Sequence, residues 1–177
     1  MTNKELLDKY PWLTPSNRFS EKFITDCAGP TGEEGYWPGS PLNHPTYNYE
    51  YTELDKLPEG WRIAFGDNLC KEMNDEIITW PLDIQKHFRI RNIENEWARL
   101  QIDMNYGTET LHKIISKYEL ISKFTCVLCG AEAEWVARWS YNPYCDKCIH
   151  KIYEEDPNDL IEEDCINIDK FYAKGED

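Results

Sequence analysis

Two cysteine pairs determine how the C-terminal half of the chain is interpreted: CVLCG at residues 126–130 and CDKC at residues 145–148. The 15 residues between the pairs give the CxxC-x15-CxxC pattern of a four-cysteine zinc site. Two residues between cysteines allow a tight knuckle that aims both sulfur atoms at one point, and Gly130 tolerates the positive φ that such a turn often needs. The pattern predicts one structural metal ion, zinc or iron, with zinc favoured, held by Cys126, Cys129, Cys145 and Cys148.

The number of sulfur ligands distinguishes a structural metal from a catalytic one. Four thiolates close a tetrahedron, whereas a catalytic zinc keeps one position open. His150 follows the last cysteine by two residues and could replace one ligand, but four sulfur atoms make it unnecessary. The alternative is a pair of dithiol redox motifs, which usually occur as a single CxxC at the start of a helix. The segment from Glu134 to Trp139 is expected to form a strand between the two pairs.

Upstream of the cysteines, hydrophobic periodicity predicts two amphipathic helices. The first begins at Pro58, which suits a first helical turn, and runs to about Ile78. The second is capped by Thr108 and ends near Lys123. Apolar residues recur at helical spacing in both, so each should turn one face to a core. The first stripe consists of Trp61, Phe65, Leu69, Met73 and Ile77.

Between these helices the period of the apolar residues changes from helical to two. Alternation from Phe88 to Tyr106, with a turn near Glu94-Asn95, predicts a two-stranded antiparallel ribbon with one buried face. The fold class is therefore α+β: a ribbon packed with two helices, plus a small zinc-ribbon-like subdomain. We divide the chain into a domain at 1–123, the zinc subdomain at 124–150 and an acidic C-terminal tail at 151–177.

A long loop interrupts the first domain. Residues 29–45 hold four Gly and four Pro, a density of helix and strand breakers that predicts irregular structure. Tyr36 and Trp37 are unusual in a solvated linker, so we assign them to a partner-binding surface. The rings of Tyr47, Tyr49 and Tyr51 alternate with polar residues, which indicates a strand that packs its rings on a core or, alternatively, an aromatic contact surface.

The charge balance restricts the partners. A formal charge of −14 and a pI near 4.7 argue against sequence-independent nucleic-acid binding, which needs Lys and Arg to neutralise phosphates. Ten of the 33 acidic residues lie in residues 150–177, against three lysines. This stretch is either a solvated tail or a surface for a basic partner. We place three residues at that surface: Glu162, Glu163 and Asp164.

Targeting signals are not evident in the sequence. No apolar stretch is long enough for a membrane span, and residues 1–13 lack the apolar core of a signal peptide. We therefore expect a cytoplasmic protein without a membrane partner. The chain has seven cysteines, and an odd number cannot all pair in disulfides within one chain. This also favours metal binding in a reducing compartment. Cys70 lies beside the first helical stripe and is expected to be a small core residue. The sequence does not define the oligomeric state.

Several short segments resemble a family of small, uncharacterised phage and prophage proteins. They are KYPWL at 9–13, YTELD at 51–55, PEGW at 58–61, AFG at 64–66, and the two cysteine pairs with Tyr144. The resemblance covers about two-thirds of the chain and excludes residues 29–45 and the acidic tail. It implies a phage or prophage gene and a metal knuckle, and it supplies no catalytic residues.

These observations lead to a functional hypothesis and two alternatives. We expect a non-enzymatic acidic phage protein with a structural zinc, which binds and inhibits a basic host protein, by analogy one of an antiviral defence system. One alternative is a small enzyme in which His44, His87 or His112 meets a carboxylate. The other is a nucleic-acid-binding zinc ribbon.

Overall fold

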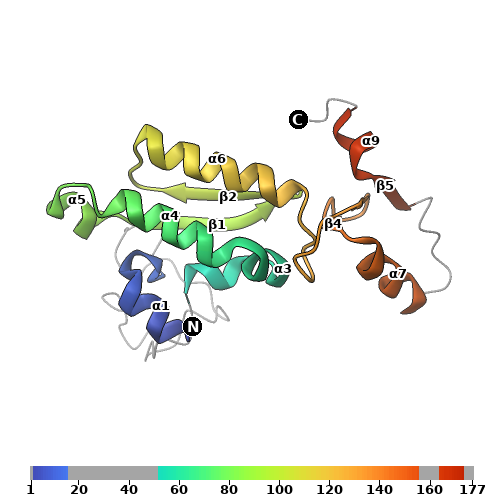
Figure 1. Ribbon diagram of the computed structural model, residues 1–177, viewed down its shortest axis with the longest axis horizontal. Helices are drawn as coiled ribbons and strands as arrows, with labels where there is room; N and C mark the ends of the chain where they lie inside the picture. Colours follow the sequence, from blue (N-terminus) through green and yellow to red (C-terminus); the bar gives the residue numbers. More distant parts are fainter. Residues whose placement is uncertain (1, 16–51, 156–163, 174–177) are drawn as a thin grey trace, which may run out of the picture.

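The computed structural model describes residues 2–15, 52–155 and 164–173 (Figure 1). Helices combine with two small antiparallel sheets, one ordered β1-β2 and the other β4-β3-β5, so the predicted α+β class is confirmed. The predicted loop at 29–45 and the alternating tyrosines at 47–51 lie outside the described residues. Among the described residues, no helix is both long and apolar enough to cross a bilayer.

The N-terminal part of the fold is helical. Its elements are α1 (Asn3–Lys9), η1 (Pro11–Leu13), η2 (Glu53–Lys56), α3 (Glu59–Trp61), η3 (Arg62–Gly66) and α4 (Asp67–Ile77). The helix predicted from 58 to 78 is present, although η3 is a π-helical segment in its middle. All five residues of the predicted stripe are buried, and Cys70 is buried beside them as expected.

The predicted ribbon consists of β1 (Ile90–Glu96) and β2 (Arg99–Met104), preceded by the short helix α5 (Leu82–His87). The strands pair through Glu96 and Arg99, so the turn is Trp97-Ala98. The prediction of a turn near Glu94-Asn95 was wrong, because Glu94 and Asn95 stay in the ladder opposite Gln101 and Leu100. Neither Trp nor Ala is a typical turn residue, so composition gave no signal for this turn.

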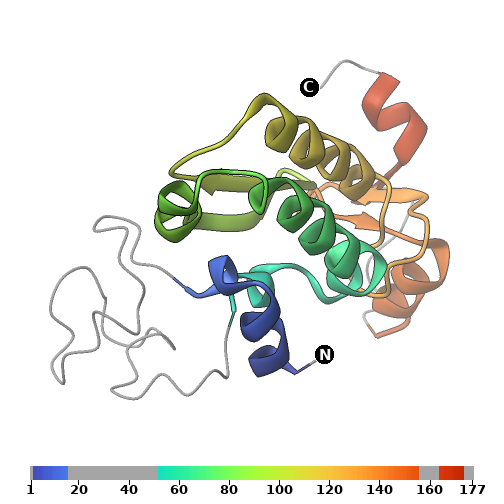
Figure 2. The same cartoon turned by 60° about the vertical axis from the view of Figure 1, so that its left-hand side comes forward.

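Helix α6 (Glu109–Lys123) packs along β2, and α4 packs along α6 (Figures 1 and 2). Thr108 caps α6 as predicted, and its hydroxyl accepts a hydrogen bond from the Leu111 amide at 3.1 Å. The buried hydroxyl of Ser122 accepts a hydrogen bond from the Leu100 amide at 2.8 Å and thereby joins α6 to β2. Helix α6 therefore covers β2, and α4 packs beside α6.

The C-terminal part contains β3 (Trp135–Ala137), β4 (Pro143–Tyr144), α7 (Asp146–Glu155), β5 (Cys165–Asn167) and α9 (Ile168–Ala173). The predicted strand between the cysteine pairs is β3. Helix α7 extends beyond residue 150, and β5 pairs with β3 through Ile166 and Val136. Part of the segment predicted as a tail thus contributes a strand to the same sheet as the cysteine region. The three-part division of the chain itself stays a prediction.

Candidate metal centre

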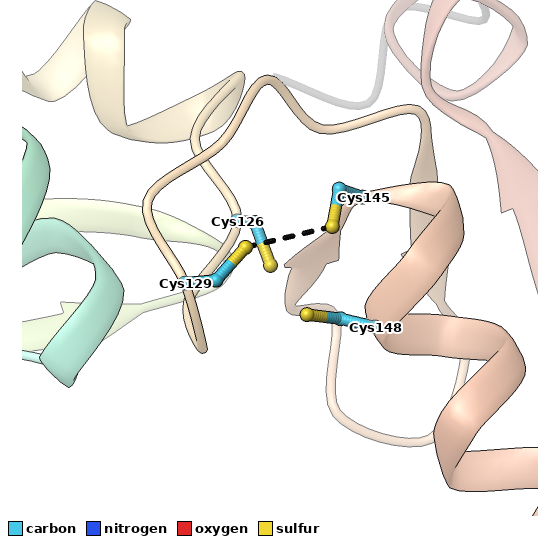
Figure 3. Close-up of side chains that lie close together, drawn as sticks. All are labelled: Cys126, Cys129, Cys145 and Cys148. Carbon is cyan, nitrogen blue, oxygen red and sulfur yellow. Dashed lines mark hydrogen bonds between the residues drawn. The ribbon is translucent and has the colours of Figure 1, made fainter.

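The four predicted cysteines converge on one point (Figure 3). All four Sγ atoms lie within 4.8 Å of one another, and those of Cys129 and Cys145 are 3.6 Å apart. A tetrahedron with Zn–S bonds of about 2.3 Å has sulfur atoms roughly 3.8 Å apart, whereas a disulfide bond is about 2.05 Å long. The thiols are free, and their spacing fits a tetrahedral metal site.

Two local structures position the sulfur atoms. Cys126 and Cys129 lie on a knuckle between α6 and β3, which is closed by the hydrogen bond from the Gly130 amide to the Cys126 carbonyl at 3.0 Å. Gly130 has a φ of 78°, as the sequence predicted, and this left-handed conformation turns the chain after Cys129. Cys145 immediately precedes α7 and Cys148 lies in its first turn, so both project from one helix end.

The surroundings of the sulfur atoms combine burial with hydrogen-bond donors. The Ala131 amide donates to Cys129 and lowers the pKa of this exposed thiol. Burial raises the pKa of Cys145 and of Cys148, and the Cys148 amide opposes the rise at Cys145. A bound divalent cation would hold all four sulfur atoms as thiolates, with the positive N-terminal end of α7 favouring them further. The donor set therefore suits a soft or borderline cation such as Zn²⁺.

The knuckle is seated directly on α3. The Gly60 amide donates to the Val127 carbonyl at 2.9 Å, and the indole Nε1 of Trp61 donates to the Thr125 carbonyl at 2.8 Å. A Cβ atom on Gly60 would lie 2.1 Å from the Cys126 carbonyl oxygen, so only glycine permits this approach. No spacing pattern in the sequence predicts that Gly60 and Trp61 contact the cysteine region.

Of the other predicted site residues, the structure describes only Asp164. Tyr36, Trp37, Glu162 and Glu163 lie outside the described residues. Asp164 is half-buried, and its carbonyl accepts a hydrogen bond from the Arg138 amide at 2.8 Å, which joins it to the strand pair of β3 and β5.

The described histidines lie apart from the sulfur atoms. His150 is exposed, with its Nε2 3.3 Å from a carboxylate oxygen of Asp146. His87 and His112 are exposed on α5 and α6, and His87 Nδ1 contacts a backbone carbonyl. His44 lies outside the described residues, so the alternative of a histidine–carboxylate enzyme site stays a prediction.

A cavity that the sequence did not reveal lies against β3, β5 and α9. It has a volume of about 600 Å³, and its lining includes Trp135, Arg138, Asn167 and Lys170. These residues come from segments about thirty positions apart that meet only through the pairing of β3 with β5. The cavity is separate from the four-cysteine cluster, since none of the four clustered cysteines lines it.

No protein-family model, curated protein or solved structure matches the chain. The class of protein is therefore defined from the fold and the site alone. It is an α+β protein with a four-cysteine cluster consistent with a metal site. No family is identified, and the resemblance to phage and prophage proteins stays a prediction.

Proposed function

We propose that this protein is a binding protein whose fold is stabilised by one structural Zn²⁺. The observation that supports the metal most directly is the convergence of four cysteine Sγ atoms within 4.8 Å. Four protein ligands leave no coordination position for a substrate or a water nucleophile, so the metal would shape the protein without performing chemistry. Cys126, Cys129, Cys145 and Cys148 are the proposed ligands.

Elemental analysis of the purified, reduced chain tests the metal. We expect one zinc ion per chain and no iron. Replacement of one ligand by Cys148→Ser should lower the zinc content well below one, because three sulfur ligands bind more weakly than four. Cys70→Ala is the matched control, since Cys70 is a buried cysteine outside the cluster and should retain the metal. A wild-type chain without bound metal would contradict the proposal.

The proposed partner is a basic protein. The support is the formal charge of −14, which favours association with a positive surface and disfavours polyanions. We further propose that the chain is phage-encoded, acts in the host cytoplasm and inhibits a host protein of an antiviral defence system. This step rests on the resemblance of the short segments quoted above and on analogy of origin.

Affinity capture from host lysate tests the partner. The tagged chain should retain a protein of high pI at low salt, and the amount should fall at high salt because charge attraction is screened. Purification of that protein and measurement of its activity with and without the chain would then test inhibition. Recovery of no partner at either salt concentration would contradict the binding role, and retention of DNA or RNA would favour the nucleic-acid alternative.

A further inference from the structure

Two exposed aromatic rings meet where the ribbon adjoins the three-stranded sheet. Trp97 is 66% exposed and belongs to the β1–β2 turn, while Tyr141 is 37% exposed and lies between β3 and β4. Their ring centroids are 5.2 Å apart in an edge-to-face arrangement with an interplanar angle of 62°. Figure 1 shows this end of the ribbon next to β4. The ring pair therefore spans two sheets and faces solvent.

The backbone at both rings is unfavourable for aromatic residues. Trp97 has a φ of 52° and Tyr141 a φ of 55°, and the only other non-glycine residue with positive φ in the described chain is Ala98. Glycine and asparagine occupy this left-handed region at lower cost. Since Trp97 is 66% exposed as a residue, burial does little to offset that cost. Strained, exposed residues of this kind gather at functional sites, and neither turn requires an aromatic side chain.

Contacts within the chain hold the two turns together and the Tyr141 ring in place. The Tyr141 amide donates to the Ala137 carbonyl at 2.7 Å. Between the two turns, the Asn95 side-chain amide donates to the Asn142 side-chain oxygen at 2.6 Å. Below the surface, the Tyr141 ring packs against Phe171 at 6.2 Å. A ligand that binds the rings would therefore lose little free energy in ordering the two turns and the Tyr141 ring.

The net charge of −14 favours a cationic ligand at the exposed rings over an anionic one. Glu94 and Glu96 lie within three residues of Trp97 on β1. The nearby Arg99 is engaged by Glu119, with a nitrogen–oxygen distance of 3.4 Å, and Arg138 lines the cavity on β3 and β5. Aromatic faces attract cations through their quadrupole, and arginine stacks on tryptophan most readily. Phosphate groups would be repelled by the same carboxylates.

We propose that Trp97 and Tyr141 form the recognition site for an arginine side chain of a basic protein partner. The guanidinium group stacks on the exposed indole face, and the acidic surface attracts the rest of the partner segment. This assignment rests on the proposed binding role and names the surface through which it operates.

The test uses an oligo-arginine peptide as the probe and the full chain with its metal. Binding is measured by calorimetry at low and high salt, with oligo-lysine and single-stranded DNA as comparison ligands. Trp97→Asn and Tyr141→Asn remove a ring and place a residue suited to left-handed backbone, so both variants should fold. Trp139→Ala is the matched control, because Trp139 is 60% exposed but contacts Tyr144 instead of this pair.

We expect each asparagine variant to bind oligo-arginine about two- to fivefold more weakly, the size of one cation–π contact at an exposed site, and the Trp139 variant to bind like wild type. Equal binding by wild type and Trp97→Asn, no binding of oligo-arginine, or tighter binding of DNA would each overturn the assignment. If a natural partner were captured equally by wild type and Trp97→Asn, the surface would be wrong while the binding role stood.

Discussion

Gly60 and Gly130 determine how closely the cysteine knuckle at residues 126–130 approaches α3. A Cβ atom on Gly60 would lie 2.1 Å from the Cys126 carbonyl oxygen, and one on Gly130 would lie 2.6 Å from the Gly60 carbonyl oxygen. Both contacts are with backbone atoms, which cannot move aside as a side chain can. The hydrogen bond from the Gly60 amide to the Val127 carbonyl depends on this approach. A single methyl group would therefore separate two elements that the fold holds together.

The first prediction concerns Gly60→Ala. The added methyl group should lower the free energy of unfolding by about 1–3 kcal/mol, as overpacking does in cores, and should weaken metal retention. Urea denaturation together with zinc analysis measures both effects. Gly66→Ala is the control, because its Cβ would lie 3.6 Å from the nearest atom and should be neutral or stabilising. Equal stability of the two variants would refute the close contact.

Ser122 provides a second test at the residue scale. Its hydroxyl accepts from the buried Leu100 amide and donates to the Glu119 carbonyl at 2.7 Å. Ser122→Ala leaves that amide without its acceptor, so we expect a loss of about 1–3 kcal/mol in the free energy of unfolding. Ser116→Ala, at an exposed position of the same helix, should change stability by less than about 0.5 kcal/mol. Thermal and urea unfolding of both variants provide the measurement.

At the scale of elements, the sequence predicts well where apolar periodicity extends over several turns. The stripe from Trp61 to Ile77 and the cap at Thr108 place α4 and α6 correctly, and the alternation after Phe88 identifies the ribbon. The Trp97-Ala98 turn was missed because its residues carry no turn signal. The pairing of β5 with β3 was missed because three-residue strands joined across long sequence separation leave no periodic pattern.

The contact between α4 and α6 leads to a pH prediction. Glu72 on α4 accepts hydrogen bonds from Lys117 at 2.6 Å and from the Tyr118 hydroxyl at 2.8 Å on α6. The bond from Lys117 is the main reason that the pKa of Glu72 lies below its ordinary value. A lowered carboxyl pKa stabilises the folded state above the unfolded-state pKa, and that stabilisation is lost as the pH falls through the folded-state pKa.

We therefore expect Glu72→Gln to be less stable than wild type near neutral pH, by about 1 kcal/mol or less because the pair is partly exposed. The difference should shrink as acid protonates Glu72 in the wild-type chain. Unfolding of both proteins across the acid range measures it, with Glu109→Gln as a control for an exposed ion pair within one helix turn. A difference that stayed constant down to strongly acidic pH would exclude the Glu72 carboxylate as its source.

At the scale of the whole molecule, the cysteine region belongs to the main hydrophobic core. Cys126 and Val127 lie in the same buried cluster as Trp61 and Leu111. The sequence pattern of a short metal ribbon predicts a small subdomain at 124–150 that would unfold locally without metal. The packing of the knuckle against α3 changes that expectation, because backbone carbonyls of the knuckle accept hydrogen bonds from Gly60 and Trp61 in the helical layer. Such long-range contacts depend on how the whole chain folds, so the spacing of the cysteines does not predict them.

The final prediction is that metal removal destabilises the ribbon and helices together with the knuckle. Structural zinc contributes an apparent 10–16 kcal/mol of binding free energy in small peptides, as much as the whole stability of a typical domain. Because the cysteine region shares one core with the ribbon and helices, loss of this binding free energy should destabilise residues beyond the four cysteines. Chelation should therefore increase hydrogen exchange at the buried Ile93 and Leu100 amides in parallel with exchange around Cys126.

Two further observations make this prediction specific to the metal. Addition of zinc to the chelated chain should restore protection in both regions, whereas Cys148→Ser should stay unprotected after zinc is added, because it lacks a ligand. Cys70→Ala separates loss of metal from loss of packing, since Cys70 lies in the core without belonging to the sulfur cluster. Its free energy of unfolding should fall by the amount expected for one small truncation in a core. Its response to chelation should stay like that of wild type. Exchange confined to residues near the sulfur atoms, with Leu100 still protected, would show that the knuckle folds independently of the core.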